Sequence, residues 1–272
     1  VDLDGDEILV GSYGFDRSDD QKFVGAAYLY ERSGGSWEES RKFMAPSPEA
    51  RDTFGVSVAL DGDRAAIGSV HRQEDVGEAY LYVRRNGSWE APREVTADRS
   101  EEEPHFGRFV ALQGDEAFVS AVADHDRPDN NDARGTVYVY EWTGGAWEKR
   151  QEVTPSDVGE GSTFGTGPAI EGDTLIVGAE DADHEGESDV GAAYVYKRSG
   201  GEWQETRKIV ATGSRVRNEF AVDVAFDGTT SLVGTYLDDP QGKEDAGSAS
   251  FYVQSPDSDG DGVADQNDNC PD

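Results

Sequence analysis

The chain has 272 residues, of which 24 are Lys or Arg and 57 are Asp or Glu, so its formal net charge is −33. This charge excludes nucleic acids and anionic membranes as good partners, because their phosphate groups would be repelled. A single cysteine, Cys270, excludes an internal disulfide framework, and no apolar run approaches the roughly 20 residues of a membrane span.

The first predicted elements follow a tight-turn glycine, Gly5. A strand ends near Gly11, a second opens at Gly25 with the segment G-A-A-Y-L-Y, and a third begins at Trp37. If four strands A to D make one unit, these are strands B, C and D, and the first unit lacks strand A.

The second unit is the clearest. Phe, Val, Val and Leu alternate with small residues over residues 54–60, the period of two that is typical of a strand, and this predicts strand A. A D-G-D hairpin turn leads to strand B over residues 64–69. Strand C follows over 78–83, and strand D starts at Trp89 and runs through 93–95.

The same marks recur about every 55 residues, which indicates an internal repeat. The Trp residues that open strand D are 52, 58 and 56 residues apart, and the last unit has strands A, B and C but no D. The recurring positions are Trp37, Trp89, Trp147 and Trp203; Phe54, Phe106, Phe164 and Phe220; and Gly25, Gly77, Gly135, Gly191 and Gly247.

Five units of four short antiparallel strands predict an all-β fold, a β-propeller of about five blades whose first and last blades are incomplete. The alternative is a two-sheet sandwich, which does not require such marks. A short stretch upstream of Val1 would supply the missing strands and close a five-bladed ring, and further upstream blades are an open alternative. We expect the chain to be part of a longer multidomain protein.

The pattern resembles the FG-GAP repeat of integrin-α-like propellers over residues 1–254. Each later unit starts strand A with Phe-Gly or the variant Phe220-Ala221, and strand B ends with Gly-Ser, Gly-Ala or a similar pair. The resemblance implies that one face of loops contacts partners. It also implies calcium in a D-x-D-x-D-G-x-x-D loop between strands A and B, but here that connection is a Gly-Asp hairpin, too short to wrap an ion.

The strongest chemical motif lies in a second predicted segment, residues 255–272. Residues 257–268 read D-S-D-G-D-G-V-A-D-Q-N-D, the spacing of a calcium loop with a glycine at its sharp turn. Followed by N-C-P, the segment resembles a thrombospondin type 3 repeat, which implies a disulfide partner for Cys270 outside this chain. The expected ligands are Asp257, Asp259, Asp261, the carbonyl of Val263, Asp265 and Asp268.

A second candidate calcium site lies between strands B and C of the fourth unit. Asp181, Asp183, Glu185 and Asp189 match D-x-D-x-E-G-x-x-D, although acids are common enough in this chain for a chance match. A weaker version in the third unit uses Asp124, Asp126 and Asp132, where a solvated acidic loop is the favoured interpretation.

The long loops between strands B and C, together with the connections between strands D and A, are expected to form the ligand face. The B–C loops are residues 12–24, 69–76, 121–134, 179–190 and 235–246. The four histidines lack zinc spacing, and no nucleophile elbow or Walker loop is present, so we expect no enzyme.

The leading hypothesis is an extracellular or cell-surface adhesion module that binds a protein or a glycan. The alternatives are a lectin or non-catalytic propeller of a carbohydrate-active enzyme, and a structural array. The acidic charge favours a salt-adapted organism over an ordinary acidic secreted protein, because molar salt shortens the Debye length to about 3 Å.

Overall fold

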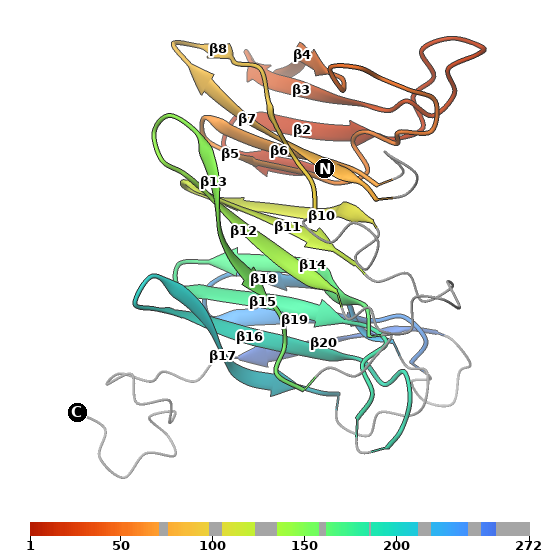
Figure 1. Cartoon of the computed structure of the whole chain (residues 1–272), viewed down its shortest axis with the longest axis vertical. Coiled ribbons are helices and arrows are strands. Elements are labelled where there is room, and N and C mark those ends of the chain that lie inside the picture. The colour runs from red at the N-terminus through yellow and green to blue at the C-terminus, as the bar shows by residue number, and fades with distance from the viewer. Residues whose placement is uncertain are drawn as a thin grey trace.

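The computed structural model describes residues 1–70, 76–97, 105–122, 135–157, 162–184, 186–211, 219–238 and 246–253 (Figure 1). Over these ranges the chain forms twenty strands and no helix, so none of the described segments is a helix that could span a membrane. The strands are β1 Asp2–Asp4, β2 Glu7–Ser12, β3 Ala26–Ser33, β4 Ser36–Phe43, β5 Val58–Asp61, β6 Arg64–Ser69, β7 Glu78–Arg85, β8 Ser88–Trp89, β9 Arg93–Val95, β10 Phe106–Gln113, β11 Glu116–Ala121, β12 Thr136–Trp142, β13 Trp147–Val153, β14 Phe164–Glu171, β15 Thr174–Ala179, β16 Ala192–Ser199, β17 Glu202–Ile209, β18 Phe220–Phe226, β19 Thr230–Thr235 and β20 Ser248–Val253.

The strands form five antiparallel sheets, which we number as blades 1 to 5. Blade 1 is β1-β2-β3-β4, blade 3 is β10-β11-β12-β13 and blade 4 is β14-β15-β16-β17. In blade 2 the last strand is divided into β8 and β9, which both pair with β7. Blade 5 has β18, β19 and β20, so the predicted propeller blades are confirmed and the described part of blade 5 has no strand D.

The prediction for blade 1 was wrong in one respect. Asp2–Asp4 pairs with Glu7–Leu9 and forms strand A, so the blade has all four strands. The segment is only three residues long and lacks the Phe-Gly that marks strand A elsewhere. Because two of its three residues are acidic, it shows no alternation of apolar residues from which a strand could be predicted.

Local sequence explains where the strands turn. Gly62, at the predicted turn between β5 and β6, has φ of 54°, and Asn86 and Gly87 both have positive φ between β7 and β8. These backbone conformations suit Gly and Asn and match the twist of a two-residue hairpin. Strand B of blade 2 occupies residues 64–69 as predicted.

Small residues allow the inner strands of neighbouring blades to touch. A Cβ atom on Gly68 would lie 1.8 Å from the carbonyl oxygen of Gly107 in the next blade, and one on Gly25 would lie 2.1 Å from that of Phe54. The amide of Phe54 donates a hydrogen bond to the carbonyl of Val24 at 3.2 Å. In blades 2 to 5, the Phe that opens strand A therefore lies directly against the glycine that precedes strand C of the preceding blade, Gly25, Gly77, Gly135 or Gly191.

The hydrophobic core consists of four clusters, one between each pair of consecutive blades. Toward the next blade, a blade presents mainly aliphatic side chains, such as Leu9 and Leu29 of blade 1. Toward the previous blade it presents Tyr residues of strand C and the Trp of strand D, such as Tyr82 and Trp89 of blade 2. We call these two sides the aliphatic face and the aromatic face of a blade.

The five blades form an open arc. Blade 1 lies at the top of Figure 1, whereas blades 4 and 5 lie at the bottom. Among the described residues, no core cluster joins blade 1 to blade 5. Within the described residues, no blade packs against the aromatic face of blade 1 or the aliphatic face of blade 5.

Candidate functional site

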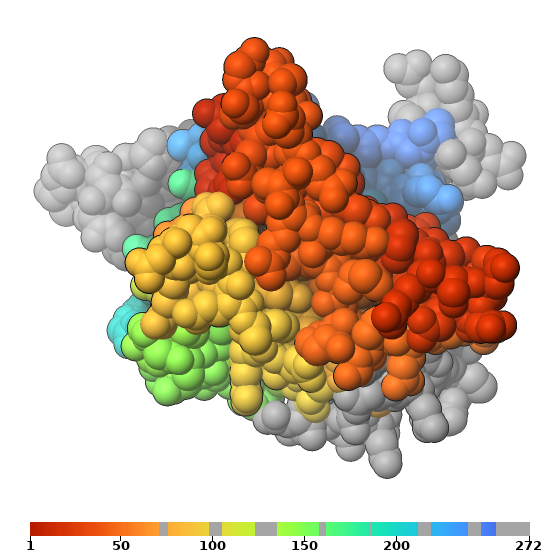
Figure 2. Space-filling model, turned by 90° about the horizontal axis from the view of Figure 1, so that it is seen from above, coloured from red at the N-terminus to blue at the C-terminus, as the bar shows by residue number. Residues whose placement is uncertain are grey.

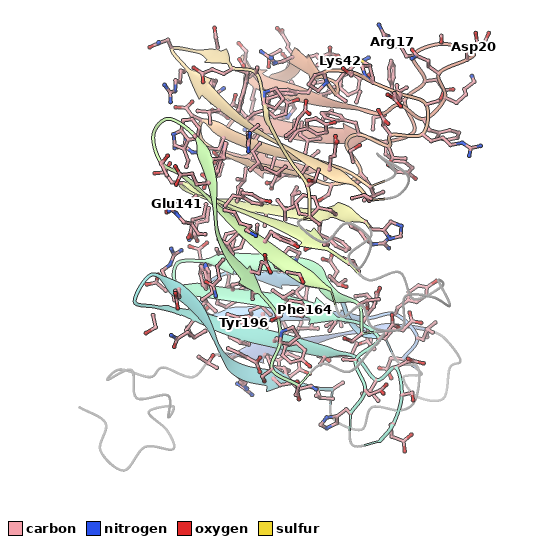
Figure 3. The ribbon with its side chains drawn as sticks, in the orientation of Figure 1. Arg17, Asp20, Lys42, Glu141, Phe164 and Tyr196 are labelled. Atoms are coloured by element: carbon pink, nitrogen blue, oxygen red, sulfur yellow. The ribbon has the colours of Figure 1, made fainter. Side chains whose placement is uncertain are left out.

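The two rims of the arc differ in how their strands are connected. Tight hairpins between strands A and B and between C and D lie on the left in Figure 1, and the longer B–C loops project on the right. In Figure 3, Arg17 and Asp20 of the first B–C loop point outward on that side, whereas Glu141 lies toward the opposite rim. We call the side with the B–C loops the loop face.

The first B–C loop, residues 12–25, is held by its own hydrogen bonds. The amide of Phe15 donates to the carbonyl of Ser12, and that of Gly25 donates to the carbonyl of Phe15, both at 3.1 Å. Asp16 accepts the amide of Phe23 at 2.8 Å and the ammonium of Lys22 at 3.0 Å. These hydrogen bonds give the loop a defined conformation. The loop projects from blade 1, as the red lobe in Figure 2 shows.

These hydrogen bonds change the acidity of the Asp16 carboxyl. The hydrogen bond from the Phe23 amide, aided by Lys22, lowers the pKa of Asp16 below its ordinary value. Lys42 lies against the loop from β4, with Nζ 3.4 Å from the ring centroid of Phe15, which is a cation–π contact. The loop thus carries a fixed charge pattern on the loop face.

The fourth B–C loop, which holds the second predicted calcium set, repeats this frame. The amide of Ala182 donates to the carbonyl of Ala179 at 3.2 Å, and that of Gly191 donates to the carbonyl of Ala182 at 3.0 Å. Asp183 accepts the amide of Asp189 at 3.2 Å. Asp183 therefore stands where Asp16 stands in the first loop.

The comparison of the two loops bears on cation binding. In the first loop an ammonium group, that of Lys22, occupies the second oxygen of the aspartate. Counting back from the glycine that recurs before strand C, Gly25 or Gly191, the residue at the position of Lys22 in the fourth loop is Ser188, which carries no charge. The fourth loop therefore has the equivalent aspartate, Asp183, but has no lysine at the position of Lys22.

The structure describes three of the four residues that were predicted to bind calcium in the fourth loop. The amide of Asp181 donates to Thr163 Oγ1 at 3.2 Å, and Asp183 and Asp189 are joined as above. Glu185 lies outside the described residues, and within those residues no three Asp, Glu, His or Cys side chains are gathered closely enough to hold a metal. The fourth-loop site therefore stays a prediction.

Two other predicted sets lie wholly outside the described residues. They are the C-terminal set, Asp257, Asp259, Asp261, Val263, Asp265 and Asp268, and the third-unit set, Asp124, Asp126 and Asp132. Calcium at either place stays a prediction.

Sequence reasoning missed Glu180, which follows strand B of blade 4 on the loop face. Burial raises the pKa of its carboxyl to about 7, and the neighbouring Asp181 adds to the rise, while Arg108 of blade 3 opposes it. Near neutral pH such a group is divided between its acid and its carboxylate, so it can both donate and accept a hydrogen bond. The signal was an acid at a position where other units have Tyr or Val.

The loop face also exposes aromatic rings. Tyr13 and Tyr236 directly follow strand B in blades 1 and 5, at the position of Glu180, and are 57% and 65% exposed. Phe23 of the first loop is 51% exposed. Of the large hydrophobic side chains exposed in the described residues, these three lie on the loop face, and the others belong to the ends of the arc.

The solved structures that resemble this one share little sequence with the chain. A protein from Lactobacillus plantarum is 15% identical with a TM-score of 0.50, covering 93% of this chain and 68% of its own. The β-propeller domain of the trilobed protease from Pyrococcus furiosus is 12% identical with a TM-score of 0.51, covering 93% and 67%. The GH74 xyloglucanase from Xanthomonas campestris is 15% identical with a TM-score of 0.49, covering 91% and 35%. No curated protein matches the chain.

The match to a family is more specific. The model described as "FG-GAP repeat" matches four consecutive stretches, residues 37–82, 89–140, 147–196 and 203–253. Each stretch starts at the Trp of strand D and ends in strand C of the following blade, as the repeat in the sequence does. Since these stretches cover most of the chain, it belongs to the FG-GAP repeat family.

Proposed function

We propose that this propeller is a non-enzymatic binding module, secreted or displayed on the cell surface, whose loop face contacts a protein or glycan ligand. The observation that carries the proposal is the exposure of the Tyr13, Phe23 and Tyr236 rings on the loop face. These rings do not belong to the outer faces of blades 1 and 5. Exposed aromatic side chains on a rigid scaffold are typical anchors of binding surfaces. FG-GAP repeats are also typical of extracellular proteins, in keeping with an adhesion role.

A glycan is the ligand class that the side chains support best. Tyr rings offer flat apolar surfaces on which sugar rings stack, and Glu180, with its pKa near 7, supplies a hydrogen-bonding carboxyl at the equivalent position of blade 4. This favours the lectin alternative among adhesion functions. A structural blade array with no ligand would have no need of either feature.

The proposal also includes calcium binding by the C-terminal segment and adaptation of the chain to high salt. The C-terminal loop from Asp257 to Asp268 would hold calcium and stiffen the segment after the propeller, because five clustered carboxylates repel one another without a cation. The net charge of −33 supports a salt-adapted source, in which repulsion between copies and within each copy is screened.

A glycan array and a panel of matrix proteins, probed with the chain at molar salt, test the binding function. The double variant Tyr13→Ser with Tyr236→Ser should lose at least about tenfold in affinity for whatever the wild type binds. The matched control is Glu202→Ser on the opposite rim, exposed and outside the B–C loops, which should bind as the wild type does. If the double variant also binds as the wild type does, the loop face is not the binding surface.

A further inference from the structure

The hairpin between β7 and β8 of blade 2 carries a sequence that the equivalent hairpins lack. Its turn is Asn86-Gly87, and Ser88 follows. An Asn with Ser or Thr two residues later, and no Pro between them, is the acceptor sequence for N-linked glycosylation. The chain has six asparagines, and Asn86 is the one that stands in such a sequence.

The shape of the turn accounts for only part of this sequence. Asn86 has φ of 51°, a conformation that suits Asn or Gly in a two-residue hairpin. The residues at its position in blades 1, 3 and 4 are Gly34, Gly144 and Gly200, all with positive φ. The turn does not require the hydroxyl of Ser88, because the residues at that position in the other three blades are Ser36, Ala146 and Glu202. Blade 2 alone combines the amide with the hydroxyl.

The acceptor sequence faces solvent. Asn86, Gly87 and Ser88 are all exposed. Within the described residues, the side chains of Asn86 and Ser88 make no hydrogen bond. The amide nitrogen that would carry a sugar is therefore accessible and is not engaged in holding the fold.

The strand pairing around the turn is also short. β8 pairs with β7 at two positions, whereas strand D of blades 1, 3 and 4 pairs with strand C at seven, six and seven positions. Pro92, which has no backbone N–H, lies between β8 and β9. A transferase has to draw the acceptor sequence into its own active site, and a turn held by two pairs opens locally at lower cost than one held by a long ladder.

The hairpin lies on the rim opposite the loop face, at the upper left in Figure 1. Arg85, next to the acceptor sequence, donates a hydrogen bond to the carbonyl of Gly144 at 2.6 Å and lies over Trp142, 5.1 Å from its ring centroid. A glycan on Asn86 would therefore project beside the junction between the C–D hairpins of blades 2 and 3. It would leave the exposed aromatic rings of the loop face uncovered.

We propose that Asn86 is an N-glycosylation site, which places a glycan on the rim away from the ligand. The proposal rests on the proposed secretion or surface display, because glycan transfer accompanies export. The donor is an oligosaccharide carried on a lipid phosphate. Asn86 Nδ2 forms a bond to the anomeric carbon of the first sugar, the bond from that carbon to the phosphate oxygen breaks, and the lipid phosphate leaves with the electron pair. The amide gives up one proton in the exchange.

Mass spectrometry of the chain isolated from the cells that produce it tests the proposal. The tryptic peptide that ends at Arg93 should carry a glycan, with sugar fragment ions and the attachment at Asn86. Asn86→Gln and Ser88→Ala should both lose the glycan, and Ser88→Thr should keep it. Ser88→Ala retains the Asn-Gly pair, so it also separates glycosylation from deamidation of Asn86, which needs no hydroxyl.

The matched control is Asn86→Gly, which restores the Gly-Gly turn of the other blades and removes the acceptor nitrogen. It should fold, carry no glycan and bind the same loop-face ligand as the glycosylated wild type with equal affinity. A chain recovered outside the cells with an unmodified Asn86 overturns this proposal and leaves the proposed function standing, whereas a chain retained inside the cells overturns both. A glycan that persists in Ser88→Ala also contradicts the assignment.

Discussion

The guanidinium of Arg84 in blade 2 holds the carboxylate of Glu7 in blade 1 with two parallel hydrogen bonds, Nη1–Oε1 at 2.5 Å and Nη2–Oε2 at 2.8 Å. Both side chains are largely buried, with 19% and 17% of their surface exposed. The hydrogen bonds to Glu7 raise the pKa of Arg84 further above its ordinary value, with partial burial opposing the rise. Arg198 repeats the arrangement with Glu116 between blades 4 and 3.

Replacement of Glu7 by glutamine should destabilise the chain, because the amide removes the charge that the Arg84 fork matches. We expect a loss of about 2 kcal/mol in the free energy of unfolding, measured by urea denaturation at fixed salt. Glu38→Gln, an exposed acid on β4, is the control and should change stability by no more than about 0.5 kcal/mol. Equal effects of the two variants would show that the pair contributes nothing to the blade contact.

Gly68 tests how closely the inner strands approach. Alanine at this position would place Cβ 1.8 Å from the carbonyl oxygen of Gly107, which is backbone and cannot move without shifting blade 3. We expect Gly68→Ala to cost about 3 kcal/mol or more, or to prevent folding.

The matched control is Gly145→Ala in the hairpin between β12 and β13. No atom lies within 4 Å of a Cβ there, and its φ is not positive, so we expect a change within about 0.5 kcal/mol. A thermal melt of both variants suffices, and a Gly68→Ala variant as stable as the control would mean that the blades can separate at no cost.

The repeat explains how much of this fold the sequence could predict. Strand B over residues 64–69, the turn at Gly62 and the start of a strand near Trp203 follow from alternation, a turn glycine and the recurring Trp, which are all visible in the local sequence. Strand A of blade 1 was missed because three residues with two acids carry no such pattern. The open arc could not be predicted, since the angle between blades depends on how side chains of two sheets interdigitate.

The candidate site was predictable only in outline. Variable B–C loops between constant strands indicated the loop face, and the pairing of Asp183 with the Asp189 amide follows a spacing visible in the sequence. The raised pKa of Glu180 could not be inferred, because it depends on burial next to Asp181 and on the distance to Arg108 of another blade. Such contacts are products of tertiary structure.

Glu180 makes stability depend on pH. Its folded-state pKa of about 7 lies above the ordinary 4.5, so the folded chain binds more protons than the unfolded chain between these values. Stability from this group is therefore full below about pH 4.5 and is lost as the pH rises through 7. Glu180→Gln should be on the order of 2 kcal/mol more stable than the wild type at pH 8, since part of the carboxyl remains in contact with water.

The measurement is the difference in unfolding free energy between Glu180→Gln and wild type from pH 5 to 8, in which the background of other acids cancels. A difference that stays flat from pH 5 to 8 would mean that the carboxyl of Glu180 is ionised in the folded chain as it is in the unfolded one.

Removal of the residues after 254 should separate the calcium bound by the C-terminal loop from any calcium bound by the B–C loops. Calorimetric titration with calcium at molar salt should show binding to the full chain, and the chain ending at residue 254 should keep only what the B–C loops bind. Asp259→Asn should remove most of the difference between the two, because it removes a ligand at loop position 3. Asp183→Asn tests the fourth loop in the truncated chain. If neither chain binds calcium, both predicted sites fail.

Salt should raise the stability of this chain through screening of its surface acids. The Debye length falls from about 10 Å at 0.1 M salt to about 3 Å at 1 M, which removes most repulsion between exposed carboxylates but acts less on a buried fork such as Arg84 with Glu7. We therefore expect the thermal midpoint to rise between these two NaCl concentrations. A variant that replaces the exposed Glu38, Glu39 and Glu202 by glutamine should melt higher than the wild type in low salt and gain less from added salt, because it has less repulsion to screen. Parallel salt curves for the two chains would attribute the rise to general salting-out of apolar surface, and a midpoint no lower in low salt would contradict adaptation to salt altogether.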